Sequence, residues 1–523
     1  MVLDEEELRF GRFALCPRAR TLLADGVPVE LGARAFDLLA ALVRSNGTLL
    51  TKDALMAQAW PGAIVEENNL HVQIGAIRRA LGDDRDAVIT VPGRGYRFGL
   101  KLREPGGGSA DGRVSPPGAP SRLSLVVLPF QAIGPEAGTL ADGVTDSLTT
   151  DLSRALPGGT VVSRSSAGAY GGQAMTARRI GEALGTRYLL EGSVAVQGTR
   201  VRVNAQLIAA ETDLHLWAER FDQPRDDDLL RTQDLVVARL VRLVSLQVVF
   251  AEAQRGGAPP DAEALALRAK SVAVAARMSA EAVAEARLLY AQALLLDGTC
   301  VEAAAGLASM EAYAVVNGLT PPEERAARLA EAGRLAAQAL AAQPGHLCAL
   351  QARAVVLRAR GQFADAIAAA ESVLARCPGD PPACREIGLS RLYLGEAEAA
   401  IAWFRQADQS GPGDPVRWTW LQGLGRALLH AGRPEEAVPV LRTLTGCHPG
   451  WPFGHALLAL ALDAVGEAEG AREHMVEFRR HAPSAEGRGQ ARLVPVPAGR
   501  QDPAYHARDT ALFARLAVLD AQV

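Results

Sequence analysis

The stretches VEENNLHVQIGAIRRALGD (residues 65–83) and ITVPGRGYRF (residues 89–98) decide the fold of the N-terminal part of the chain. At about 100° per residue, four apolar side chains of the first stretch fall in one stripe: Leu70, Ile74, Ile77 and Leu81. This spacing predicts an amphipathic helix that buries the stripe. The second stretch predicts a β-hairpin whose tip, Pro92-Gly93-Arg94-Gly95, holds an arginine between two glycines.

The helix face opposite the stripe carries small or hydrogen-bonding residues: Asn68, Asn69, Val72, Gly75, Ala76 and Arg79. Such a face has no band of solvated charge and can lie in a groove. Glycines on both sides of Arg94 allow a tight turn and a close approach to a partner, while the guanidinium projects forward. These features indicate DNA binding; the simpler alternative is that Arg78 and Arg79 only solvate the end of the helix.

The residues before this helix complete a domain. Short apolar runs around Asp25-Gly26 predict strands, residues 35–45 predict a first helix, and Thr51 can cap a second short helix. Together with the third helix and the hairpin, they resemble the winged-helix DNA-binding domain of OmpR/PhoB-type response regulators. The resemblance covers about residues 8–100.

The predicted DNA-binding residues lie around the second and third helices and the hairpin: Thr51, Trp60, Asn68, Asn69, Val72, Gln73, Ala76, Arg78, Arg79, Arg94, Gly95 and Tyr96. The resemblance implies that Trp60 and Arg78 lie beside the phosphate backbone. The amide side chains can read base edges, the small apolar ones can touch thymine methyl groups, and Arg94 can read minor-groove width. Phosphate-regulon activators carry arginines where this chain has Gly75 and Ala76, so we expect modest base specificity per half-site.

Charge does not mark the domain as a DNA-binding one. Residues 1–102 contain 13 Lys and Arg against 13 Asp and Glu, and the whole chain has a formal net charge of −4. Strongly basic domains are the usual signature of nucleic-acid binding. We therefore expect a homodimer on repeated half-sites, because pairing two weak domains raises binding through effective concentration.

Composition indicates a globular chain of several domains. Of 523 residues, 49% are hydrophobic and 22% are charged. No window of about 18 apolar residues lacks a charge, and the acidic N-terminus is unlike a signal peptide. We expect a cytoplasmic protein without a membrane partner. The six cysteines form no C-x-x-C pair, so reduced thiols are expected, with no metal and no cofactor.

A Gly-, Pro- and Ser-rich stretch, residues 103–122, predicts a flexible linker after the winged helix. Residues 123–255 then read as an α/β domain. It begins with the buried-strand run LSLVVLPF, contains a hairpin near Gly198 and ends in a long helix at residues 228–254. This part resembles the TolB-like N-terminal domain. The acidic residues and His215 match no known catalytic spacing, and no phosphate-binding loop is present, so we expect no enzymatic activity.

The C-terminal half is repetitive. Gly361, Gly395, Gly432 and Gly466 recur at spacings of 34, 37 and 34 residues. This period indicates tetratricopeptide repeats, and residues 256–483 are expected to form about six helix pairs. Residues 484–523 are expected to form a tail with a capping helix around residues 509–519. The predicted fold is thus multidomain α+β: a winged helix-turn-helix domain (residues 1–102), an α/β TolB-like domain and an all-α solenoid.

The solenoid is expected to bind an unidentified protein or peptide on its concave surface. Candidate lining residues are Arg353, Arg385, Arg391, Trp418, Trp420 and His455, although each is more often ordinary surface or packing. Two functions fit the sequence. The first is a DNA-binding transcriptional regulator, with double-stranded DNA and RNA polymerase as candidate partners and the remaining domains as sensor and dimerisation modules. The second is a repeat scaffold whose winged helix no longer reads DNA.

Overall fold

The computed structural model describes residues 8–10, 13–16, 20–24, 27–29, 31–45, 50–59, 67–82, 87–91, 95–98, 102–103, 121–156, 158–172, 175–226, 228–255, 260–482 and 501–522. The chain divides into two compact units, residues 1–117 and 118–523. The two predicted domains that follow the linker therefore lie in one compact unit.

The first unit combines three helices with two small antiparallel sheets. Its helices are α1 (Ala33–Arg44), α2 (Lys52–Ala59) and α3 (Glu67–Leu81). Its strands are β1 (Leu8–Phe10), β2 (Phe13–Cys16), β3 (Thr21–Ala24), β4 (Val27–Val29), β5 (Leu50–Thr51), β6 (Val88–Val91), β7 (Gly95–Phe98) and β8 (Leu102–Arg103). One sheet has the strand order β4-β3-β2-β1-β8 and the other β5-β7-β6. Strand β8 extends the first sheet to Arg103, just past the predicted boundary.

The core of this unit lies between the helices and both sheets. It includes the predicted stripe of α3, Phe36 of α1, and Phe10 and Phe98 from the strands. Phe10 and Phe98 meet edge to face at 5.0 Å between ring centroids. The three helices and the β6-β7 hairpin thus form the winged-helix arrangement that the sequence predicts.

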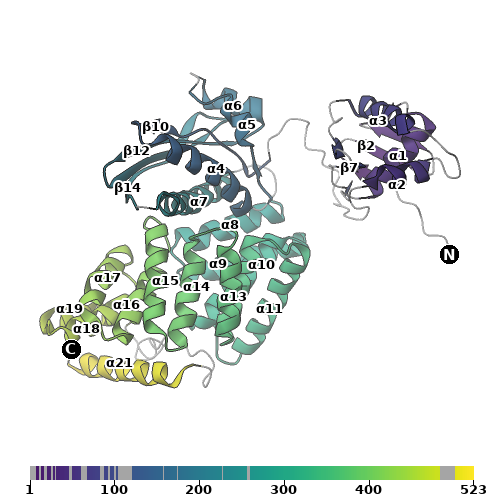
Figure 1. Cartoon of the computed structure of the whole chain (residues 1–523). Helices are drawn as coiled ribbons and strands as arrows, with labels where there is room; N and C mark the ends of the chain where they lie inside the picture. Colours follow the sequence, from purple (N-terminus) through teal and green to yellow (C-terminus); the bar gives the residue numbers. More distant parts are fainter. Residues whose placement is uncertain are drawn as a thin grey trace. The chain divides into compact units, whose positions relative to one another are not determined.

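The second unit begins with an α/β layer (Figure 1). Its strands are β9 (Ser124–Val127), β10 (Gln131–Ile133), β11 (Thr160–Val161), β12 (Tyr188–Gln197), β13 (Arg200–Ala209) and β14 (Leu214–Pro224). They form a mixed sheet of order β11-β9-β12-β13-β14, with β10 also pairing to β12. Its helices are α4 (Gly138–Ala155), α5 (Arg164–Gly168), α6 (Ala177–Leu184) and α7 (Leu229–Gln254). The predicted strands and helices are present. The short elements β10 and α5 were not predicted.

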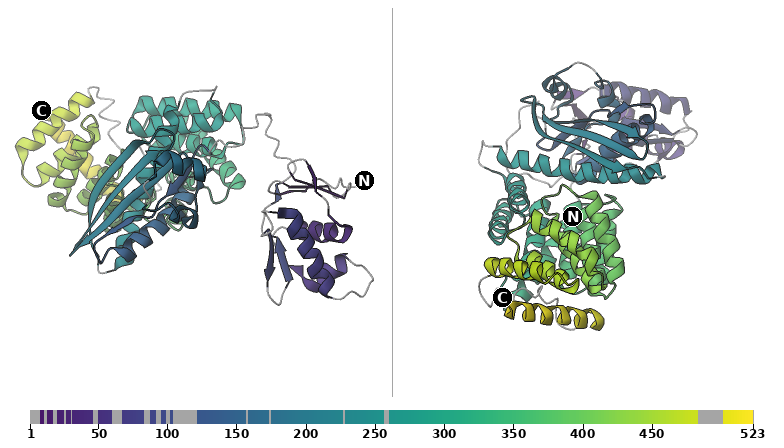
Figure 2. Two further views of the ribbon diagram at one scale, coloured as in Figure 1. Left: turned by 90° about the horizontal axis from the view of Figure 1, so that it is seen from above. Right: turned by 90° about the vertical axis from the view of Figure 1, so that its left-hand side faces the viewer.

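Helix α7 lies between the sheet and the helices that follow (Figure 2). One face packs on α4 and the sheet, and the other contacts α8 and α15. A single hydrophobic core therefore runs from Leu125 in the sheet through Val241 of α7 to Ile387 among the repeats. A helix with apolar side chains on most of its surface is expected in such a buried place.

The rest of the unit consists mainly of six antiparallel helix pairs in the described residues 260–482 (Figure 1). They are α8 (Ala262–Ala275), α9 (Ala280–Leu296), α10 (Val301–Val316), α11 (Arg325–Ala342), α12 (Leu347–Ala359), α13 (Phe363–Leu374), α14 (Pro381–Tyr393), α15 (Ala397–Ser410), α16 (Trp418–His430), α17 (Pro434–Cys447), α18 (Pro452–Ala464) and α19 (Ala468–His481). The four repeating glycines lie in the turns inside four pairs, with φ between 72° and 87°. This left-handed conformation favours glycine, which explains their recurrence.

A final helix, α21 (Pro503–Ala521), packs on α16, α18 and α19. It buries Tyr505, Leu516 and Leu519. The expected C-terminal helix is thus present and longer than predicted. Within the part of the chain that the structure describes, no helix is both long and apolar enough to span a bilayer.

Candidate nucleic-acid interface

Helix α3 separates a buried face from an open one. Leu70, Ile74, Ile77 and Leu81 are at most 2% exposed, as their spacing predicts. On the other face, Asn69 and Arg79 are exposed, and Val72 is 54% exposed. Gln73 and Ala76 are half-buried. An exposed valine beside polar side chains leaves a surface that can enter a groove.

Gly75 makes the open face shallow at its centre. A Cβ added at Gly75 would meet no atom within 4 Å. The helix surface is therefore open at this position, and the unit's described residues leave room for a Cβ.

Arg78 is held inside the unit. Its Nη2 donates to the Val88 carbonyl oxygen at 2.6 Å and to Thr90 Oγ1 at 2.8 Å, which ties α3 to strand β6. Arg79 is exposed, and its Nε donates only a long bond, 3.4 Å, to the Gly75 carbonyl oxygen. Arg79 is thus the freer of the two guanidinium groups, and Arg78 fixes the hairpin relative to the helix.

The hairpin is anchored by Gly95. This residue has φ of 145°, and an added Cβ would lie 2.0 Å from the Leu50 carbonyl oxygen. Only glycine allows β7 to approach β5 this closely. In β5, Thr51 accepts a bond from the Ala54 amide at 3.3 Å, so it caps α2 as predicted.

Gly95 is buried, and so is Tyr96, whose side chain is only 2% exposed and lies in the core. That burial leaves it little surface for a ligand, and we assign it a packing role. Its neighbour Arg97 is exposed on β7, where the pleat turns alternate side chains outward. Alternation along GYRF could have indicated Arg97 as a contact residue, but it was not among the predicted set.

Three predicted residues cannot be placed in detail. Trp60 and Arg94 lie outside the described residues, as does the side chain of Asn68, whose backbone is part of α3. Their DNA-binding roles stay predictions.

The family model described as "Transcriptional regulatory protein, C terminal" matches residues 26–98, which span α1–α3 and the hairpin. These residues form an OmpR/PhoB-type winged-helix domain. Its relatives include the phosphate regulon regulatory protein PhoB of Pseudomonas aeruginosa, 33% identical over 100 residues (19% of this chain and 44% of PhoB). The transcriptional regulatory protein CutR of Streptomyces coelicolor is 34% identical over 85 residues, 16% of this chain and 39% of CutR.

A longer match joins this chain to a Rhizobium meliloti protein provisionally named adenylate cyclase 3. It is 34% identical over 230 residues, 42% of this chain and 38% of that protein. The chain spans less than half the length of each of these relatives. Among solved structures, the pilus biogenesis factor PilW has 18% identity and a TM-score of 0.34, covering 44% of this chain and 97% of PilW. The repeat architecture rests on the helix pairs themselves.

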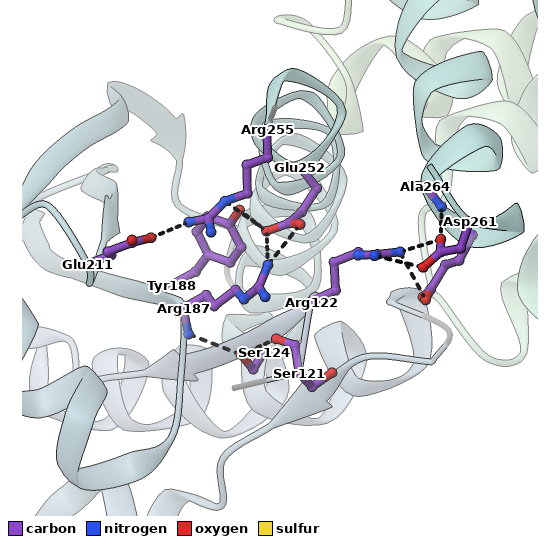
Figure 3. Close-up of polar contacts among 11 residues, drawn as sticks. Ser121, Arg122, Ser124, Arg187, Tyr188, Glu211, Glu252, Arg255, Asp261 and Ala264 are labelled. Carbon is purple, nitrogen blue, oxygen red and sulfur yellow. Dashed lines mark hydrogen bonds and ion pairs between the residues drawn. The ribbon is translucent and has the colours of Figure 1, made fainter. Parts of the chain in front are cut away.

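The second unit has a polar junction around Arg122, close to where its described residues begin (Figure 3). Arg122 donates to both carboxylate oxygens of Asp261, at 2.8 and 2.9 Å. Asp261 also caps α8 by accepting from the Ala264 amide. The hydrogen bond from Arg122 lowers the pKa of Asp261. The first residues of the unit are thereby joined to the first repeat.

A buried carboxylate lies at the centre of the junction (Figure 3). Glu252, near the end of α7, accepts from the Tyr188 hydroxyl at 2.6 Å and from Arg187 at 3.1 and 3.2 Å. Arg255 lies 3.3 Å from the same carboxylate and 3.2 Å from Glu211. Burial raises the pKa of Tyr188, so its hydroxyl stays protonated as a donor. These bonds fix the end of α7 to the sheet.

Three of the six candidate groove residues on the repeats are buried in the packing between helices. Trp420 is fully buried, and Trp418 and His455 are 3% and 5% exposed. Arg391 bonds Glu396 at 2.6 Å. Arg385 lines a hollow between α10, α12, α14 and α16, together with Tyr313 and Gln422. Of the aromatic candidates, Trp418 alone borders this hollow. Two of the six predicted lining residues, Arg385 and Trp418, therefore line it.

Proposed function

We propose that the chain is a transcriptional regulator whose winged-helix domain binds promoter DNA through α3 and the hairpin. The observation that carries this proposal is the open face of α3, where Asn69, Val72 and Arg79 surround an accessible Gly75 in a domain of OmpR/PhoB type. The relatives named as transcriptional regulators match this chain over the same kind of domain.

Binding would be weak for one domain and stronger for two. The open face offers few bidentate readers of base edges, and each such reader contributes about 1–3 kcal/mol of discrimination. A homodimer on repeated half-sites would supply the missing affinity. RNA polymerase is a candidate partner of the bound dimer.

The second unit would receive the signal without catalysing a reaction. In this proposal its TolB-like layer and repeats bind a protein, peptide or small molecule and alter dimerisation. The Arg122–Asp261 bonds support this division, because they join the start of the unit to the first repeat.

The test is the salt dependence of DNA binding by the full chain. Loss of one phosphate contact reduces the slope of log K against log salt by about 0.9. We expect Arg79→Ala and Arg94→Ala each to weaken binding and to lower this slope, measured by fluorescence anisotropy. Arg334→Ala, at an exposed position of α11, is the matched control. It should change neither the DNA affinity nor the salt slope.

An unchanged slope in both winged-helix variants would refute the proposed DNA contacts. If the full chain also fails to bind any DNA, while a pulldown through residues 261–523 retains a protein partner, the scaffold function replaces the regulator.

A further inference from the structure

A cavity lies between α7 and the edge of the repeats, beside the polar junction. Its volume is about 60 Å³, enough for several waters. Its walls come from the start of β9, the end of α4, and helices α7, α8, α10, α12 and α14. About half of the lining is aliphatic, and five lining residues are charged: Arg242, Glu263, Lys270, Glu302 and Asp380.

Helix α7 lines the cavity along one of its faces. Ala238, Arg242, Ser245 and Val249 line it at helical spacing, so they follow one another along one face. Arg242 and Ser245 supply a polar end. Val249, with Leu123 and Leu267 from other elements, supplies an apolar end.

The polar end has donors without acceptors. Arg242 donates through Nε to Asp414 at 2.5 Å, and among the described residues its two terminal nitrogens have no hydrogen-bond partner. The Ser245 hydroxyl is buried and, within the described part of the unit, also has no partner. Two such groups one turn apart fit a carboxylate, since guanidinium binds carboxylate through paired N–H groups.

The same end has a carboxylate without a cation. Asp380 is 6% exposed, and it accepts from Gln351 at 3.1 Å and from the Ala383 amide at 2.8 Å. No Lys, Arg or His nitrogen of the described ranges lies within 4.0 Å of it. Burial raises the pKa of Asp380, and the nearby charge of Arg242 offsets this only in part. An ammonium group would compensate it.

Glu302 and Cys348, which also line the cavity, belong to a set of metal-type ligands that is already neutralised. Glu302, His346 and Cys348 lie within 4.8 Å of one another. However, Lys270 Nζ lies 3.4 Å from Glu302 and 3.5 Å from Cys348, so an ammonium group fills the cation position. His346 Nδ1 accepts from the Ala349 amide, which leaves the proton of the neutral ring on Nε2. This set therefore does not explain the cavity.

We propose that the cavity binds a small aliphatic α-amino acid as its zwitterion. The carboxylate would bind Arg242 and Ser245, the ammonium group Asp380, and the side chain the apolar end at Val249. One ligand would satisfy the spare donors, the partly compensated carboxylate and the aliphatic walls together.

The site adjoins the Arg122–Asp261 junction, near the start of the unit's described residues. Leu123 and Glu263 line the cavity, and they directly follow Arg122 and lie beside Asp261 of the junction. Occupancy would therefore stiffen the contact between α7 and the first repeats. Ligand binding itself does not depend on the DNA-binding role proposed above.

Isothermal titration calorimetry on the full chain tests the site, with L-valine and L-leucine as probes. Isovalerate lacks the ammonium group and isobutylamine lacks the carboxylate, and we expect both to bind at least about tenfold more weakly than the amino acids. Asp380→Asn keeps a helix-capping side chain but removes the charge, and should weaken valine binding about tenfold. Ser245→Ala should weaken it several-fold.

Asp228→Asn is the matched control. Asp228 caps α7 outside the cavity, so its replacement should leave valine affinity unchanged. Absence of heat with both amino acids in the folded wild-type chain would overturn the proposal. So would equal affinity for valine and isovalerate, or binding that Asp380→Asn and Ser245→Ala leave intact.

Discussion

At the scale of single residues, the candidate DNA-binding face of α3 has no arginine at its centre. Gly75 and the half-buried Ala76 stand at the centre of the open face of α3, where phosphate-regulon activators carry arginines. Arg78, which the sequence marks as a phosphate contact, bonds Val88 and Thr90 within the unit. The exposed Asn69, Val72 and Arg79 therefore carry most of the described surface that DNA can reach.

Gly75→Arg should turn this weak face into a stronger one. The position has room for a side chain, and arginine favours a helix over glycine by up to about 1 kcal/mol. We expect three- to tenfold tighter DNA binding at low salt and a slope steeper by about 0.9, measured by fluorescence anisotropy. Gly75→Gln controls for size and helix propensity. Equal affinity of the two variants would show that α3 does not approach phosphates.

At the scale of elements, α7 and α21 are positioned by contacts that connect distant segments. Arg242 of α7 meets Asp414 across 172 residues of chain. Helix α21 is held by Asp509, which accepts from Arg426 and lies 3.3 Å from His430 Nε2. Burial opposes ionisation of Asp509, but the His430 hydrogen bond and the Arg426 charge outweigh it and lower its pKa.

The docking of α21 should weaken in mild acid. Burial lowers the pKa of His430 below the ordinary value of 6.5. Between the folded and unfolded pKa values the unfolded chain binds more protons, so the free energy of unfolding rises with pH and falls below about pH 6.5. Burial also lowers the pKa values of His346, His448 and His474, which adds to the same trend.

Urea denaturation of the full chain at pH 7.5 and pH 5.5 measures this effect. We expect a lower midpoint at pH 5.5, and a smaller difference in His430→Gln than in the wild type. His506→Gln, at an exposed position of α21, should behave as the wild type. A urea midpoint that is the same at both pH values would contradict the predicted loss of stability in mild acid.

At the scale of the whole molecule, local patterns predict most elements and few of their contacts. Periodicity predicts the buried stripe of α3, the hairpin at Gly198 and the helix that becomes α7. Repeat spacing predicts the helix pairs, because each unit repeats the same turn and core positions. It does not predict that α7 packs on the repeats as well as on the sheet, since an apolar helix surface names no partner.

In the candidate sites, too, local patterns predict the elements but not the contacts between them. Helical spacing separates the open face of α3 from its core, but the burial of Tyr96 depends on the packing of β7 against α1 and β5. The cavity was not predicted at all. It joins Arg242, Ser245 and Asp380, which are up to 138 residues apart in a chain of 523. Only the three-dimensional contact between α7 and the repeat edge brings them together.

The proposed regulator recognises DNA sequence through its winged-helix domain. Selection of genomic fragments on the purified full chain, followed by sequencing, tests it most directly. We predict enrichment of fragments with two copies of a short sequence about one helical turn, 10–11 base pairs, apart. We also predict loss of this enrichment in the Arg79→Ala Arg94→Ala double variant. Recovery of no common sequence, or the same fragments with the double variant, would contradict the claim.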